Sequence, residues 1–140
     1  MPRGSRLRER TTATAAGTIT PAALTITAAT DTKVYDGTTS SSATPTVSGL
    51  LGSDTVTGLT EAFASKDVLG VNGSTLNVTA YTVNDGNSGN DYTVTTATAL
   101  GTITPAALTI TAATDTKVYD GTTTGQQTPE TVARRLKGWL

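Results

Sequence analysis

The sequence contains no cysteine and no histidine. Without them the chain cannot form a disulfide, a Ser-His-Asp or Cys-His nucleophile site, or the usual zinc cluster. Aromatic residues make up only 4% of the chain. No run of 18 apolar residues occurs, so we expect no insertion into a membrane. The basic start, Met1–Arg10, is followed by no apolar stretch, and we therefore expect no signal peptide in this chain.

Positive charge is scarce in the middle of the chain. Seven of the ten Lys and Arg residues lie in the end segments 1–10 and 125–140. The stretch Thr11–Thr124 holds three lysines against nine acidic residues, a net charge of −6. The overall net charge is −1, which gives no electrostatic basis for binding nucleic acid. We expect no nucleic-acid partner.

Threonine is abundant, at 34 of the 140 residues, and with valine it favours strands because branching at Cβ restricts χ1. Asp-Gly and Asn-Gly pairs suit tight turns between strands. The pattern predicts an all-β, small β-sandwich-like module. Its expected strands are Leu24–Ala28, Lys33–Tyr35, Thr44–Ser48, Asp54–Leu59, Asp67–Val71, Thr75–Val83 and Asp91–Thr104.

Large apolar residues are few, and they define the expected core. The candidate core residues are Leu24, Ile26, Val34, Tyr35, Val47, Val56, Phe63, Val68, Leu76, Val78, Tyr81, Tyr92 and Val94.

The segment Glu61–Lys66 fits either one helical turn or a bulged strand, and the pattern does not decide between them.

The chain repeats itself. Gly17–Thr39 and Gly101–Thr123 are identical, and the match extends back to Thr11–Ala15 against Thr95–Ala99, at an offset of 84 residues. This period is too long for solenoid units of roughly 20–50 residues and fits whole domains strung in series.

Proline sets the expected phase of the repeat, because Thr20-Pro21 and Thr104-Pro105 each interrupt a strand-like run. We expect one complete module at residues 22–105, with the tail of a preceding repeat at 11–21 and the head of a following one at 106–124. Residues 1–10 and 125–140 lie outside the repeat. The latter segment includes a helix signal at Thr128–Leu140. A basic amphipathic helix is one reading of that segment, and ends foreign to the array are the other.

Four segments then carry a resemblance. They are KVYDGTT (Lys33–Thr39), EAFASKDVLG (Glu61–Gly70), GNDYTV (Gly89–Val94) and ITPAALTI (Ile103–Ile110). In this order they resemble the YDG repeat, a relative of the MBG-type repeats of bacterial surface adhesins. The resemblance implies tandem modules in filamentous-haemagglutinin-like proteins that are extracellular or on the bacterial cell surface, where the repeats form a stalk or contribute to adhesion.

The acidic residues give little support for chemistry. The obvious carboxylate pairs, Asp31 with Asp36 and Asp85 with Asp91, sit in or beside Gly-rich turns, where Asp and Asn bond to nearby backbone amides. We therefore expect no enzyme activity and no cofactor. The loop NDGNSGND is the best candidate for calcium, with Asp85, Asn87 and Asp91 as ligands, because hard cations take carboxylate and amide oxygens. A plain loop is the alternative.

Two functions fit the sequence. A structural stalk or spacer needs a solvent-compatible surface and no pocket, and its partners are the neighbouring repeats. The alternative is a module that binds host glycans or mucin, with aromatic rings against sugar. Its candidate contacts are Tyr35, Asp36 and Tyr81.

The identity of the repeated peptide has a physical consequence. Leu24–Thr39 and Leu108–Thr123 can compete for the same place in the complete module. We expect exchange within the chain or strand-swapped oligomers, since an unpaired strand offers open edges.

Overall fold

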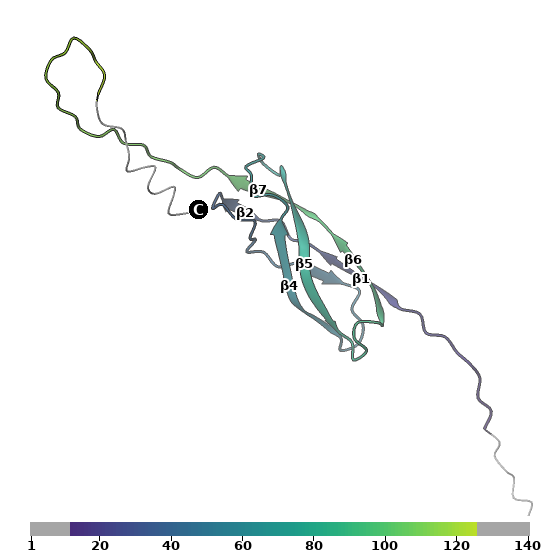
Figure 1. The fold of residues 1–140 in the computed structure, drawn as a ribbon. Coiled ribbons are helices and arrows are strands. Elements are labelled where there is room, and N and C mark those ends of the chain that lie inside the picture. Colours follow the sequence, from purple (N-terminus) through teal and green to yellow (C-terminus); the bar gives the residue numbers. More distant parts are fainter. Residues whose placement is uncertain (1–11, 126–140) are drawn as a thin grey trace, which may run out of the picture.

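The computed structural model describes residues 12–125, and the all-β prediction is confirmed there. Two sheets form, with strand orders β3-β1-β6 and β2-β7-β5-β4 (Figure 1). No helix long and apolar enough to cross a membrane occurs in this part of the chain. The strands are β1 (Ala22–Thr27), β2 (Thr32–Val34), β3 (Thr46–Ser48), β4 (Thr55–Phe63), β5 (Ser74–Asn84), β6 (Tyr92–Ala97) and β7 (Ala99–Thr104).

Two long runs of chain lie side by side and cross from one sheet to the other. β1 pairs with β6 in parallel, and β2 pairs with β7 in parallel. The register stays the same throughout, from Ala22 opposite Tyr92 to Val34 opposite Thr104. Because the pairing is parallel, the first strand enters at one end of the module and the last strand leaves at the other (Figure 1).

The core lies where these runs meet the β4–β5 hairpin. Ala28, Phe63, Leu76 and Ile103 form one buried cluster, against which Val78 and Ala99 pack. Leu24, Ile26 and Tyr92 are also buried, as predicted. Ile103 joins this core although it is absent from the predicted set.

Four predicted core residues are exposed, and the prediction is wrong for them: Val34, Tyr35, Val68 and Tyr81. Val34 is the last residue of β2, a short strand at the sheet edge with a neighbour on one side only, and Tyr35 follows directly after this strand. Tyr81 lies on the distal part of β5, which pairs only with β4, since its ladder to β7 is confined to Ser74–Leu76. A two-stranded ribbon leaves both of its faces open to solvent.

Two strand predictions also need correction. Asp67–Val71 lies in an irregular loop rather than a strand, and at its end Gly70 and the following Asn72 take positive φ angles of 91° and 53°. The expected strand Asp91–Thr104 is two strands, broken at Thr98 where the chain changes sheets. The open question over Glu61–Lys66 resolves partly to a bulged strand, because β4 continues to Phe63 through two register shifts.

Gly101 in β7 shows why the second sheet closes tightly over the core. A Cβ atom at this position would lie 2.7 Å from the Phe63 ring and 2.9 Å from Leu76 Cδ1. The missing side chain therefore lets the aromatic ring pack directly on the β7 backbone.

The expected end segment 1–10 and the helix signal at Thr128–Leu140 lie outside the described residues.

Candidate functional site

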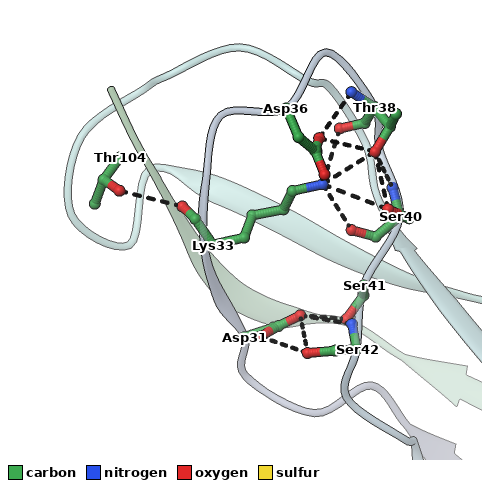
Figure 2. A network of polar contacts seen from close by, with 8 residues as sticks. All are labelled: Asp31, Lys33, Asp36, Thr38, Ser40, Ser41, Ser42 and Thr104. Carbon is green, nitrogen blue, oxygen red and sulfur yellow. Dashed lines mark hydrogen bonds and ion pairs between the residues drawn. The ribbon is translucent and has the colours of Figure 1, made fainter. Parts of the chain in front are cut away.

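The Tyr35-Asp36-Gly37 turn follows β2 and is organised by the Asp36 carboxylate. Asp36 Oδ1 accepts hydrogen bonds from the Thr38 amide (2.9 Å) and the Thr38 hydroxyl (2.8 Å). The same oxygen lies 2.7 Å from Lys33 Nζ in an ion pair (Figure 2). Gly37 has a φ of 78°, in the left-handed region that favours glycine. The turn is thus closed by one carboxylate and one glycine.

Lys33 links this turn to the core. Its Nζ also donates to the carbonyl oxygens of Thr38 (3.2 Å) and Ser40 (3.0 Å), and it lies 5.8 Å from the centroid of the buried Phe63 ring. The Lys33 side chain is only 14% exposed. The hydrogen bond from Lys33, together with those from Thr38, holds the pKa of Asp36 at about 2, below its ordinary value of 3.8. Asp36 therefore stays charged well into the acid range.

A second polar network lies beside the first. The buried Glu61 accepts hydrogen bonds from the Ala29 amide (2.7 Å) and the Ser41 hydroxyl (2.9 Å). The same Ser41 hydroxyl lies 2.7 Å from Asp31 Oδ2, which also accepts from the Ser42 amide (Figure 2). The Ser41 hydroxyl has one proton to donate, so the carboxylates of Asp31 and Glu61 share this single donor.

The pKa of Asp31 reflects both burial and hydrogen bonding. Burial raises this pKa, but the hydrogen bonds from Ser41, Ser42 and Thr32 outweigh burial and lower it. The network therefore joins β4, through Glu61, to the two segments on either side of β2.

At the opposite end of the module, the candidate calcium loop closes on itself. Asp85 Oδ1 accepts from the amides of Asn87 and Gly89, both at 2.8 Å, and Oδ2 accepts from the Asp91 amide at 3.0 Å. Asn87 Nδ2 donates to Asp91 Oδ1 at 2.7 Å. These backbone donors, the Gly89 amide first, lower the pKa of Asp85. The three candidate ligands lie together, and the carboxylates of Asp85 and Asp91 accept hydrogen bonds from the loop itself.

This loop also marks the entry of the module, because the Ala22 amide donates to the Asp91 carbonyl at 2.9 Å. Nearby, the Tyr92 hydroxyl donates to Asp54 Oδ2 (2.7 Å) and accepts from the Leu51 amide (2.9 Å). The hydrogen bond to Asp54 raises the pKa of Tyr92. The entry end is therefore tied together by its own polar groups.

The candidate sugar contacts do not converge. Tyr35 and Asp36 lie at the exit end, where the Tyr35 amide donates to the Thr104 carbonyl at 2.8 Å. Tyr81 lies toward the entry end of β5, roughly 30 Å away along the strands at about 3.3 Å per residue. Both tyrosine residues are 39% exposed. The structure places the three residues on two separate surfaces.

The second copy of the turn has the same geometry. Lys117 Nζ lies 2.7 Å from Asp120 Oδ1, and Asp120 accepts from the Thr122 amide (3.0 Å) and hydroxyl (2.9 Å). No residue from 105 to 125 lies in a strand. The polar turn therefore forms without the sheet beside it.

Chemically, these networks act as ties between segments of the chain. In residues 12–125 no group of three or more His, Cys, Asp or Glu side chains is placed to hold a metal ion. Sequence reasoning missed the buried Glu61, because a glutamate predicts solvent exposure; its alternation with Phe63 on β4 was the available signal. It also missed the Lys33–Asp36 pair, whose signal was the reappearance of both residues in the second copy.

A small all-β module closed by local polar turns is the class of protein that these observations define. The family model described as the YDG domain matches residues 20–99, which is more than half of the chain. The chain belongs to the YDG domain family. Comparison with curated proteins and with solved structures found no match.

Proposed function

We propose that this chain is a structural spacer, part of a tandem array in the stalk of a bacterial surface adhesin of the filamentous-haemagglutinin type, and not an enzyme. The parallel in-register pairing of Ala22–Val34 with Tyr92–Thr104 carries the proposal. It puts entry and exit at opposite ends, roughly 40 Å apart at about 3.3 Å per residue. Modules joined at Pro105 then add length in one direction (Figure 1).

The repeat supports the same function. After Pro105 the sequence of β1 and β2 begins again as Ala106–Val118, with no linker between the two modules. The partners of a spacer are its neighbouring repeats, and an extracellular or cell-surface location of the parent protein fits the family. The match to the YDG family and the period of 84 residues support this proposal.

Small-angle X-ray scattering tests it on chains of one, two and three 84-residue units. We expect the maximum dimension to rise by roughly 40 Å per unit, the length of one strand run. Units that fold but collapse on one another, so that the dimension grows much less than this, would rule the spacer out.

Binding of host glycans or mucin is the alternative. It has less support, because Tyr35 and Asp36 lie on a different surface from Tyr81. Adhesion of the chain to immobilised mucin, lost in Tyr35→Ala or Tyr81→Ala but not in Tyr119→Ala, would favour this alternative over the spacer.

A further inference from the structure

The same eighteen-residue peptide occurs twice in this chain in two states. In Ala22–Thr39 it forms β1 and β2, and Leu24 and Ile26 are 1% and 0% exposed. In Ala106–Thr123 it forms no strand, and Leu108 and Ile110 are each 66% exposed. An apolar pair shaped for a core is thus presented to solvent, next to a turn that is already folded.

We propose that Ala106–Thr123 of one copy of the chain inserts into the module of a second copy, in the place of that copy's own Ala22–Thr39. The partner is a second copy of this chain, and the inserted strand pairs in parallel with β6 and β7 of the receiving module. The inference does not depend on the adhesin role proposed above.

The geometry excludes the same exchange within one chain. To replace β1, Ala106 must lie opposite Tyr92, where Ala22 lies now. Ala106 follows Thr104 by two residues, which span at most about 7 Å. The run from Thr104 back to Tyr92 extends roughly 40 Å at about 3.3 Å per residue. Only another copy can therefore receive the segment.

The same short connection makes the assembly run head to tail. Pro105 keeps Thr104 extended, so the segment continues along the direction of β7. The exit end of each donor then lies against the entry end of its receiver. Two copies cannot close on each other through a connection of two residues, because each exit would have to reach back along a whole module. A repeated contact between different surfaces builds open chains.

The inserted segment, Ala106–Thr123 of the donor, and the resident segment, Ala22–Thr39 of the receiving copy, make nearly the same contacts. Their sequences agree through Thr39 and Thr123. The first difference is Ser40 against Thr124. The next is Ser41, whose hydroxyl bonds to Asp31 and Glu61 and whose counterpart is Gly125. The resident segment keeps this extra tie and is joined covalently to β3. The unmodified chain is therefore expected to be mainly monomeric, with the exchange becoming dominant when the resident segment is weakened.

Matched variants of the full chain test the proposal. Leu24→Asp/Ile26→Asp disables the resident segment, and Leu108→Asp/Ile110→Asp makes the same change in the donor segment. Analytical ultracentrifugation with circular dichroism should show folded oligomers of the first variant, growing severalfold in mass with concentration. The second variant should be a folded monomer. The quadruple variant should be neither folded nor oligomeric.

A synthetic peptide of residues 106–124 covers the case in which the first variant does not assemble. Added to Leu24→Asp/Ile26→Asp, it should bind one peptide per chain, restore the β spectrum and shorten the oligomers; the peptide with Leu108→Asp/Ile110→Asp should do none of this. If the variant neither assembles nor binds the peptide, the proposal is overturned. Binding of the peptide to a variant that forms no oligomers would overturn the head-to-tail assembly. Oligomers of the quadruple variant would mean unspecific aggregation and would also overturn the proposed assembly.

Discussion

Ala22–Thr39 and Ala106–Thr123 have one sequence and two structures. The first copy contains β1 and β2 and buries Leu24 and Ile26, whereas the second lies in no strand and exposes Leu108 and Ile110. The turn that ends each copy is nevertheless the same, with Lys and Asp 2.7 Å apart in both.

The difference between the two copies separates structure that depends on local sequence from structure that depends on tertiary contacts. The turn depends on residues at most seven positions apart, so it forms wherever its sequence occurs. The strands depend on β3, β6 and β7, which only the first copy has beside it. A peptide with high strand propensity thus remains without strand structure until a sheet supplies its hydrogen-bond partners.

The largest contrast in the free energy of unfolding is expected between Ile26→Ala and Ile110→Ala. Ile26 is fully buried, so removing its side-chain atoms leaves a cavity and should lower the free energy of unfolding by about 3 kcal/mol. Ile110→Ala should change it by less than about 0.5 kcal/mol, as an exposed position does. Urea unfolding followed by circular dichroism measures both. Equal effects would mean that the second copy is also packed.

Gly101→Val against Gly17→Val compares the two copies of the preceding segment. A side chain at Gly101 meets the Phe63 ring and Leu76, and overpacking should destabilise the module by about 2 kcal/mol. Gly17 has no atom within 4 Å of that position, so Gly17→Val should leave the unfolding midpoint unchanged. A tolerated Gly101→Val would show that the core can shift away from β7.

Gly37→Ala against Gly121→Ala examines the turn itself. Both glycines have positive φ, 78° and 76°, and alanine there should oppose the turn by about 1 kcal/mol. Only Gly37 belongs to the folded module, so only its substitution should shift the thermal midpoint. The NMR shift of the Thr38 or Thr122 amide reports the loss of each turn, and a midpoint shift from Gly121→Ala would contradict the separation of the two copies.

Part of this fold could be predicted from sequence, because it depends on residues close together in the chain. Thr75–Val83 alternates clearly enough to predict β5, and the Asp-Gly pair predicts the turn at Asp36. Asp67–Val71 was predicted wrongly because its apolar residues outweighed the turn preference of Gly70 and Asn72, which decides the structure.

The rest depends on contacts between distant residues. Nothing in the segment Ala22–Val34 specifies a parallel partner 70 positions later, and the exposure of Val34 follows from its place at a sheet edge. Glu61 is buried because Ala29 and Ser41 donate to it, and neither residue is near it in sequence. Of the candidate site residues, Asp85, Asn87 and Asp91 come together because one loop holds them, whereas Tyr81 and Tyr35 are separated by the length of β5.

The smallest expected difference lies in how the two turn aspartates titrate. Asp36 has its pKa lowered to about 2, and the pKa of Asp120 is lowered by the same kind of partner, its lysine first. A folded-state pKa below the ordinary 3.8 adds stability that is present above that value and is lost as pH falls through about 2. Asp31 and Asp85 shift in the same direction, so the module should unfold more easily at pH 2 than at pH 5.

NMR titration of the side-chain carboxyl carbons measures each aspartate separately. Lys33→Met should raise the pKa of Asp36 toward 3.8 and leave Asp120 low, and Lys117→Met should do the reverse. Because Asp120 lies outside the sheets, its low pKa should persist in a peptide of residues 106–124, even though the peptide has no module beside it. An ordinary pKa in that peptide would show that the turn needs tertiary support after all, and the two copies would then differ in their turns as well as in their strands.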